Sequence, residues 1–540
     1  MHNPESRKTM IVPITAALGP RPPKGKFFRP PTGFGVGAKG LVKKGVRAGG
    51  YAWPKKPGRA VSMPREDGPR EDGPREDGPR EDGPREDGGD HHRLAFGLLY
   101  LFTLLLYARP NDLIPAMGTF PLAKIVAILA PLAYVYAQYK VGKPIIKWTI
   151  EVKMVIVMLL QAVMFTPFAV SPGDSVATLN EVFIKTVIIF ILIIGVVSTR
   201  ERLMAMIKLS ALCGTWLAVF AIKNYATGNF TMKGDRIEGL VGGMFGNPND
   251  LAAALNMLIP LAVALALMSA GGARLLYLIC ALLLFCGVMV TFSRAGFVTL
   301  AAVSGVMLWK FGRGSRSSVT LAILAASVLL FSVFSGAYRS RLMTIFDPNT
   351  DASGSAQQRT ALLERGLDLS LRHPIVGLGM GNFHIYSIHE KVAHNGYVET
   401  AAELGLIGLL AYLIIILAPL RGLAKIERER IRPGARADLD AKYLSIGLQT
   451  ALIAYMINSF FLSIQYLWYL YYAAGFAVAL RLIYAAEKAA QANDGKAAAP
   501  SNRFRFGNLW KSAPLKPAES LWPAYRISGS PAVREGAISN

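Results

Sequence analysis

Cysteine is scarce in this sequence, and the positions of the few cysteines exclude two common kinds of site. Only 3 cysteines occur in 540 residues, and Cys213, Cys280 and Cys286 all fall inside long apolar runs. None is placed to join a disulfide in an exposed loop, and none shows the spacing of a metal-ligand set. We expect all three to be packing residues.

Acidic residues are also in the minority. The chain carries 59 Lys and Arg residues against 35 Asp and Glu, a formal net charge of +24. In a soluble protein this charge would suggest nucleic acid, but a mean hydropathy of +0.35 is too high for an ordinary soluble enzyme. We therefore expect a lipid bilayer as a partner and no nucleic acid.

The pattern of a cleavable signal peptide is missing, because the N-terminus is polar and the first apolar run comes too late. Residues 1–93 instead contain a Pro-, Gly- and Lys-rich stretch and five PREDG repeats from Pro64 to Gly88. Such repeats cannot bury a core, so we expect a disordered cytoplasmic region. Its basic part could contact anionic lipid, but a nonessential tail or an incorrectly assigned start is the favoured interpretation. We expect a second disordered cytoplasmic tail over residues 486–540.

Residues 94–485 are dominated by long apolar runs. About twelve of them approach the roughly 17–25 residues that a helix needs to cross a hydrocarbon core about 30 Å thick. We predict an all-α, polytopic membrane protein with one large, partly helical periplasmic loop at about 338–403. The predicted spans lie near residues 94–108, 117–139, 152–170, 182–198, 203–222, 251–270, 275–292, 295–311, 319–337, 404–423, 443–463 and 465–484.

The basic residues indicate how the chain is oriented. They gather in the loops after every second predicted span, which the positive-inside rule assigns to the cytoplasm. Some basic residues depart from this pattern and lie in loops predicted on the other side, among them Arg236, Arg294, Arg359 and His394. A guanidinium fork suits phosphate oxygens, so a polyanionic substrate arriving from that side would explain the arginines. For Arg294, contacts with helix-end carbonyls or lipid headgroups are an equally good explanation.

Several local signals shape the large loop. A helix is predicted after Gln358, with Arg359, Leu363, Leu367 and Ser370 or Leu371 on one stripe. It should stop at His373–Pro374. The run VGLGMGNF (376–383) lacks the Lys-Ser/Thr of a phosphate-binding loop, so we predict a turn that places the next helix.

A similar helix entry precedes the sixth predicted span. In FGNPND, Asn249 or Asp250 is predicted to cap a helix that begins near Leu251. Plain capping is favoured there over a substrate contact.

Four segments occur in a fixed order: DRIEGLVGGMFGNPNDLA, TFSRAGFV, QQRTALLERGLDLSLRHPIVGLGMGNF and AHNGYVETAAELGLIGLLAYL. Together they resemble the O-antigen ligase and polymerase superfamily of bacterial envelope membrane proteins, over roughly residues 94–485. The resemblance implies a ligase-type glycosyltransferase of the inner membrane, with its active site facing the periplasm. The donor would be a glycan on a polyprenyl pyrophosphate carrier. The acceptor would be lipid A-core, another glycan or a protein hydroxyl.

The resemblance also implies essential residues that match Arg236, Arg359 and His394. Fixed cations stabilise the negative charge of a departing pyrophosphate, so the arginines could act without a metal, and we expect no cofactor. His394 suits a general base, because a helix N-terminus disfavours the protonated imidazole. Glu399 and Glu403 could orient these groups, but helix-start electrostatics explain them at least as well. The alternative bases are His384 and His389, and the alternative phosphate ligands are Arg365 and Arg372.

Three other functions remain open. A polysaccharide polymerase would share the chemistry and differ only in the acceptor. A transporter or flippase for a lipid-linked anion predicts arginines at mid-membrane depth and an internal repeat, and no such repeat is evident. A multi-span peptidoglycan glycosyltransferase would need a catalytic carboxylate in an outside loop, and no obvious candidate is visible there.

Overall fold

The computed structural model describes residues 91–109, 121–229, 237, 245–311, 355–431 and 436–498. Contacts divide the chain into Met1–Arg85 and Glu86–Asn540, and every described residue belongs to the second unit. The PREDG repeats, the predicted span at 319–337 and the chain after residue 498 lie outside the described residues. Arg236 also lies outside them.

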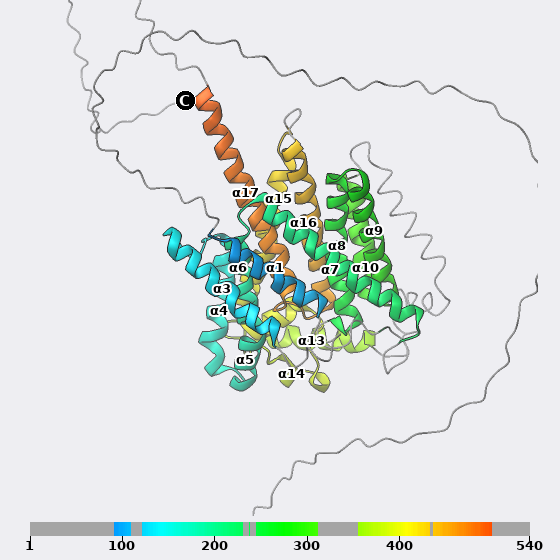
Figure 1. Cartoon of the computed structure of the whole chain (residues 1–540). Helices are drawn as coiled ribbons and strands as arrows, with labels where there is room; N and C mark the ends of the chain where they lie inside the picture. Colours follow the sequence, from blue (N-terminus) through cyan, green and yellow to red (C-terminus); the bar gives the residue numbers. More distant parts are fainter. Residues whose placement is uncertain are drawn as a thin grey trace, which may run out of the picture. The chain divides into compact units, whose positions relative to one another are not determined.

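The described residues fold into helices and contain no strand, so the all-α prediction is confirmed (Figure 1). In chain order the helices are α1 (Arg93–Ala108), α3 (Leu122–Val141), α4 (Ile150–Phe165), η2 (Thr166–Phe168), α5 (Pro172–Thr178), η3 (Leu179–Phe183), α6 (Ile184–Val196), α7 (Arg200–Ala226), α8 (Pro248–Met268), α9 (Gly271–Val290), α10 (Arg294–Phe311), α13 (Ser355–Arg372), α14 (Phe383–Tyr386), η6 (Ile388–Glu390), α15 (Gly396–Arg428), α16 (Arg436–Phe461) and α17 (Trp468–Ala498).

Within the described residues, 9 helical segments are long and apolar enough to cross a membrane, and α1 is a shorter apolar helix. A helix overlaps each predicted span that falls in the described ranges. Several boundaries differ from the prediction, and α16, for example, begins at Arg436 rather than near residue 443. Helix α15 begins at Gly396 rather than near residue 404, and α17 continues to Ala498, past the predicted start of the tail at 486. The chain is a multi-pass membrane protein.

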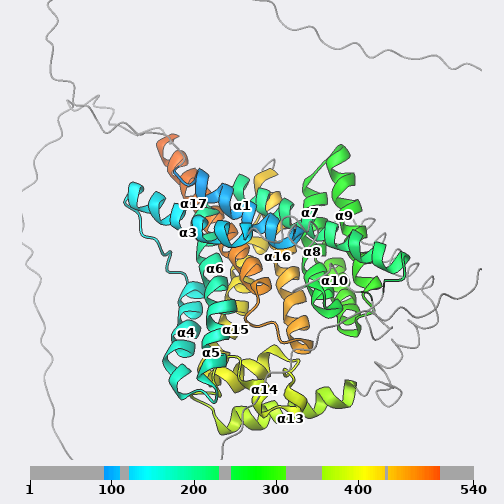
Figure 2. The same ribbon diagram turned by 60° about the horizontal axis from the view of Figure 1, so that its bottom comes forward.

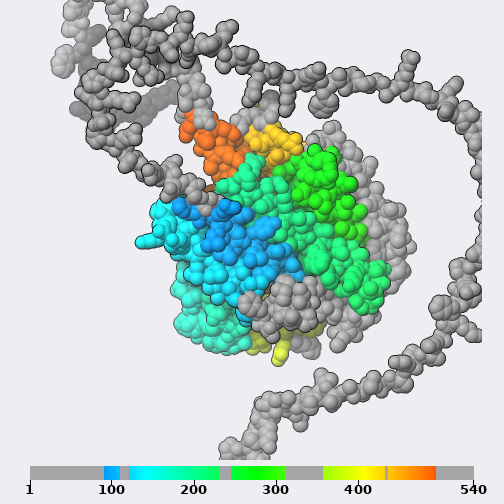
Figure 3. Space-filling model, in the orientation of Figure 1, coloured from blue at the N-terminus to red at the C-terminus, as the bar shows by residue number. Residues whose placement is uncertain are grey.

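Helix α8 lies at the centre of the bundle, and 94% of its most apolar stretch is buried. It contacts α7, α9, α10 and α16. Small residues allow the close approach: a Cβ on Gly287 of α9 would lie 2.7 Å from the Cβ of Ala218 in α7. Such close packing is what holds helices together in lipid, where apolar burial alone contributes little. At the periphery, α1 packs between α3 and α7, on the face seen in Figure 3.

The loops predicted to be cytoplasmic contact one another at one end of the bundle, which we call the basic end. Arg200 at the start of α7 forms an ion pair with Glu487 of α17 at 2.5 Å. Lys310 at the end of α10 pairs with Glu427 of α15, also at 2.5 Å. These contacts join chain segments that an alternating topology predicts on the same side.

A buried ion pair near the basic end ties α17 to α4. Arg481 donates from both terminal nitrogens to the two carboxylate oxygens of Glu151, at 2.7 and 2.8 Å. Glu151 is fully buried, and a lone buried charge would be strongly destabilising. The bidentate pair therefore fixes the position of α17, whose preceding loop reaches the opposite end of the bundle.

That opposite end, which we call the site end, carries α13 and α14. Figure 2 shows these two helices lying across the end of the bundle. Helix α13 ends at Arg372, before His373–Pro374 as predicted. Its buried apolar residues are Leu362 and Leu369, which form a small separate core with Leu378, Phe383, Ala393 and Ala402. This core attaches the loop subdomain to the first turns of α15.

Candidate functional site

Helix α15 is broken near its start, where Gly405 has φ 67° and ψ −173°. This backbone conformation is readily adopted only by glycine. The break removes three carbonyl groups from the helical hydrogen-bond pattern, and each accepts a bond from another segment. The bonds run from Leu378 N to Ala402 O at 2.8 Å, from Gly379 N to Glu403 O at 3.0 Å, and from Gln161 Nε2 to Leu404 O at 3.1 Å.

The glycine-rich segment 376–383 lies against this break. Gly377, Gly379 and Gly381 all have positive φ, at 72°, 97° and 76°. A Cβ on Gly377 would lie 2.2 Å from the carbonyl oxygen of Glu403, so this close backbone approach requires glycine. The predicted turn is present, and it packs against the broken turn of α15.

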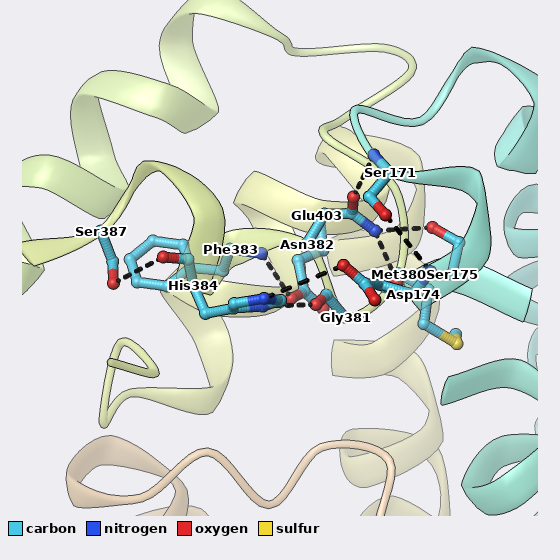
Figure 4. Close-up of polar contacts among 10 residues, drawn as sticks. All are labelled: Ser171, Asp174, Ser175, Met380, Gly381, Asn382, Phe383, His384, Ser387 and Glu403. Carbon is cyan, nitrogen blue, oxygen red and sulfur yellow. Dashed lines mark hydrogen bonds and ion pairs between the residues drawn. The ribbon is translucent and has the colours of Figure 1, made fainter. Parts of the chain in front are cut away.

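Asn382 connects the glycine-rich segment to the start of α5 (Figure 4). Its side-chain oxygen accepts a hydrogen bond of 2.6 Å from the backbone N–H of Ser171. Its side-chain nitrogen donates to the hydroxyl of Ser175 at 2.7 Å. Asn382 is fully buried, and these bonds satisfy its amide, so the loop 171–175 and the glycine-rich segment are held as one piece.

His384, an alternative base, lies two residues after Asn382 and points toward α5 (Figure 4). Its Nδ1 lies 2.9 Å from the carbonyl oxygen of Gly381, and its Nε2 lies 3.9 Å from a carboxylate oxygen of Asp174. A carbonyl only accepts, so Nδ1 carries the hydrogen in this contact. The Nε2 atom therefore faces Asp174.

Two buried glutamates of α15 hold the surrounding segments in place. Glu403 accepts hydrogen bonds from the backbone N–H of Phe383 at 3.0 Å and from the hydroxyl of Tyr466 at 2.8 Å. Glu399 accepts from the backbone N–H of Ala393 at 2.7 Å. It also accepts from the hydroxyl of Ser463 and, at 2.9 Å, from the side-chain nitrogen of Gln465. Both carboxylates are thus buried among donors, and helix-start electrostatics alone do not account for them.

His394 lies in the turn between these anchors and the helix. Its φ is 51°, in the left-handed region that few residues other than glycine adopt. On one side, Ala393 is held by Glu399. On the other side, Asn395 caps α15 by accepting from the backbone N–H groups of Tyr397 and Val398, both at 3.1 Å. The turn is fixed on both sides, which sets the direction in which the side chain of His394 leaves the backbone.

The environment of His394 disfavours its charged form. Burial is the largest cause, and the positive charges of Arg359 and Lys391 add to it, so the pKa of His394 falls to about 4. Lys391 in turn donates to Gln358, the neighbour of Arg359, at 2.7 Å. The start of α13 and the His394 turn are therefore brought together, and the imidazole is neutral at neutral pH.

Arg294 is the first residue of α10, beside the entry to α8. The hydroxyl of its neighbour Ser293 donates to the side chain of Asn249 at 2.8 Å. The predicted cap of α8 is wrong by two or three residues. Asn247 is the cap and accepts from the N–H of Asn249 at 2.9 Å, because Pro248 already occupies the first helical turn.

The end of α16 joins this region to α15. Asn458 accepts a hydrogen bond of 3.0 Å from Thr299 of α10, while the carbonyl of Met456 accepts one of 2.9 Å from the hydroxyl of Tyr397. The helix carrying Arg294 and the helix that follows His394 therefore flank the same end of α16.

The O-antigen ligase family model matches residues 279–413. This range contains Arg294, Arg359, His394, the glycine-rich segment and the broken turn of α15. The match supports membership of the chain in the O-antigen ligase superfamily. No curated protein matches the chain. Membership supports membrane glycan processing of the ligase or polymerase type.

The two alternative phosphate ligands predicted from the sequence have an ion-pair partner on their own helix, α13. Arg365 and Arg372 both pair with Asp368, at 3.3 and 2.8 Å, and Arg365 also donates to the carbonyl of Tyr386 at 3.0 Å. These bonds favour a role in holding α13. His389, the other alternative base, lies in η6.

A metal site does not emerge from the described ranges, where no group of three or more His, Cys, Asp or Glu side chains lies close enough to hold an ion. The same ranges contain Cys213, Cys280 and Cys286 as free thiols. All three lie inside candidate membrane-spanning helices, as predicted.

Several residues of the site were not identified from the sequence. Gln161, Ser463, Gln465 and Tyr466 donate to the broken turn or the buried glutamates, and Asn382 donates to Ser175 of α5. The polar run SIQY (463–466), where two predicted spans meet, was a usable signal, because polar side chains at a membrane boundary often have buried partners.

Proposed function

We propose that the chain is a ligase-type glycosyltransferase that moves a glycan from a polyprenyl pyrophosphate carrier to an acceptor hydroxyl. The observation that carries this proposal is the His394 turn. A histidine held in a strained, fixed turn is close enough to Arg359 for its positive charge to lower the histidine pKa, at one end of a membrane bundle that matches the O-antigen ligase family model.

The proposed reaction is a single displacement at the anomeric carbon. The acceptor oxygen forms a bond to that carbon while the bond from the carbon to the pyrophosphate oxygen breaks. The hydroxyl proton passes to a ring nitrogen of His394. The pyrophosphate leaves with the bonding electrons, and Arg359 and Arg236 stabilise its added negative charge. No metal is required, because the guanidinium groups supply the cations.

Donor binding would also adjust the base. An imidazole with a pKa of about 4 is neutral but weakly basic. A pyrophosphate anion bound at Arg359 would offset the positive charge that acts on His394 and raise its pKa. The base would thus become stronger when the donor is in place, which limits proton transfer to the loaded site.

The proposed site faces the periplasm. The loops rich in Lys and Arg meet at the basic end, which the positive-inside rule assigns to the cytoplasm, and His394 lies at the other end. The location of Arg359 and His394 at one end, rather than at mid-depth, favours a transferase over a flippase. A polymerase would use the same site with a lipid-linked glycan as the acceptor.

A transfer assay tests this function. Purified protein in proteoliposomes is given a polyprenyl pyrophosphate-linked glycan and, in separate reactions, lipid A-core, a second lipid-linked glycan or a protein acceptor. We expect transfer to one acceptor class, an unchanged rate in EDTA, and a loss of about 10²–10⁴-fold in kcat for His394→Ala. His373→Ala, at an exposed position of the same loop, should transfer like the wild type. Full transfer by His394→Ala would show that His394 is not the general base. No transfer to any acceptor by the wild type would show that the proposed reaction is wrong.

A further inference from the structure

Part of α13 carries apolar side chains that the protein leaves uncovered. Of the apolar residues in the predicted stripe, Leu363 is half-buried, while Leu367 and Leu371 face outward, and Leu371 is 80% exposed. Ile375, just past the helix end, is 63% exposed. The helix packs on the protein through Leu362 and Leu369 instead. The exposed apolar residues of α13 lie in its C-terminal half, because the same face carries the polar side chains of Thr360 and Glu364 in the N-terminal half.

The backbone after α13 reaches the depth of the membrane spans. The side chain of Gln161 donates a hydrogen bond of 2.8 Å to the carbonyl of Ile375. Gln161 lies inside α4, one turn before its end at Phe165, which corresponds to about 6 Å along the helix axis. The N–H of Leu406, just after the break in α15, donates to the carbonyl of Pro374 at 2.8 Å. The backbone at 374–375, which we call the dip, therefore lies closer to the middle of the bundle than the end of α4 does.

Both carbonyl groups of this dip accept hydrogen bonds from protein groups. Non-helical backbone is tolerated at membrane depth only where protein groups bond its carbonyls and amides. The carbonyls of Pro374 and Ile375 are bonded to Leu406 and Gln161, and proline has no N–H to satisfy. The side chains that the dip exposes, Pro374 and Ile375, are both apolar.

The apolar surface of the dip continues onto the spans on both sides. Exposed large apolar residues lie next to it on α15 after the break, and on α4 and η2 near their ends. They are Leu406, Ile407 and Leu410 on α15 and Leu160, Val163, Met164 and Phe168 on α4 and η2. These are the outward faces of candidate spans, which lipid covers. Leu371 and Ile375 extend the same surface toward the loop subdomain.

We propose that Leu371 and Ile375 insert into the leaflet at the site end and contact the acyl chains of bilayer lipids. The C-terminal end of α13 is then anchored in the membrane, while its polar N-terminal half, which carries Arg359, stays at the water boundary. This inference goes beyond the transfer reaction and does not depend on it. It gives the loop subdomain a direct attachment to the lipid from which a lipid-linked substrate would arrive.

Spin labels at single introduced cysteines test the insertion in nanodiscs that contain no donor. The variants are Leu371→Cys and Ile375→Cys, with Leu367→Cys as a further position. Glu364→Cys, on the same face of α13, is the matched control for water, and Leu410→Cys is the control for lipid. The wild type measures the background from its own cysteines, which lie inside spans. Accessibility is compared between molecular oxygen, which concentrates in hydrocarbon, and a water-soluble nickel complex.

We expect labels at 371 and 375 to be relaxed more by oxygen than by nickel, as at 410, and the label at 364 to show the reverse. Nickel accessibility at 371 and 375 equal to that at 364 would mean that the end of α13 faces water, and the inference would be wrong. Exclusion of both reagents from 371 and 375 would indicate a protein partner or a second copy, and would also overturn lipid contact.

Discussion

The carboxylate of Glu399 accepts a hydrogen bond of 2.7 Å from the backbone N–H of Ala393, the residue before His394. The same carboxylate accepts from Ser463 and Gln465, which lie between α16 and α17. A loop far along the chain therefore positions the proposed base through one side chain. Helix α17, which follows this loop, is in turn fixed by the pair between Arg481 and Glu151.

We predict that Glu399→Ala lowers kcat by roughly 10²-fold, the effect of a small misplacement of a catalytic group. Glu399→Gln should lose less. The Oε1 atom of Gln465 has no hydrogen-bond partner in the described part of the chain, so a rotated Gln465 amide can accept from the new side chain. The measurement is kcat in the transfer assay, with the amount of protein in the membrane as control.

A double-mutant cycle separates positioning from general stability. If Glu399 acts through His394, adding Glu399→Ala to His394→Ala should cause no further loss of transfer. An equal fold-loss in both backgrounds would instead assign Glu399 to folding, and would leave the role of His394 intact.

The pH dependence of transfer should show the lowered pKa of His394. A base with a pKa of about 4 stays neutral above that pH, so kcat/KM should fall only as the pH drops toward 4. Lys391 disfavours the imidazolium by its positive charge, so Lys391→Gln raises the pKa and moves the acid limb to higher pH. An unchanged acid limb in Lys391→Gln would mean that a group other than His394 causes the loss of activity at low pH.

Donor binding should shift the same limb. The profile of kcat/KM reports the free protein, and the profile of kcat reports the complex with donor. Because a bound pyrophosphate would raise the pKa of His394, we expect the acid limb of kcat at higher pH than that of kcat/KM. Coincident limbs would place the pyrophosphate too far away to act on the imidazole.

Arg359→Lys should impair transfer although the charge is kept. Lysine lacks the planar fork that binds two phosphate oxygens together, and loss of one such preorganised contact costs roughly 10²–10³-fold in kcat. Arg372→Lys on the same helix is the matched control, since Arg372 is exposed and pairs with Asp368. Equal activity of the two variants would show that Arg359 does not bind the pyrophosphate.

Gly405→Ala should destabilise the protein. At φ 67° an added Cβ would lie 2.6 Å from the carbonyl oxygen of Ile375, and such a backbone conformation costs about 1–3 kcal/mol even without a clash. Gly305→Ala is the control, because nothing lies within 4 Å of its added Cβ in helix α10. Thermal unfolding in detergent should show a lower Tm for Gly405→Ala alone. Equal Tm values would mean that the break in α15 is not needed for stability.

The sequence alone was sufficient for the spans that fall in the described ranges, the helix ending before His373–Pro374 and the grouping of basic loops, because these depend on local composition. Apolar length dictates a helix in hydrocarbon, and a proline restricts its own neighbour. The sequence also drew attention to Arg359 and His394 as unusual charges at a membrane boundary.

Only the tertiary structure decided what surrounds His394 and what the large loop packs against. Gln161 and Ile375 are 214 residues apart in the chain, and no local pattern predicts that one satisfies the other. The break at Gly405, the burial of Glu399 and Glu403, and the outward direction of Leu367 and Leu371 likewise depend on which segments meet. A helix pattern specifies which residues share a face, but the neighbours present determine whether that face meets protein, lipid or water.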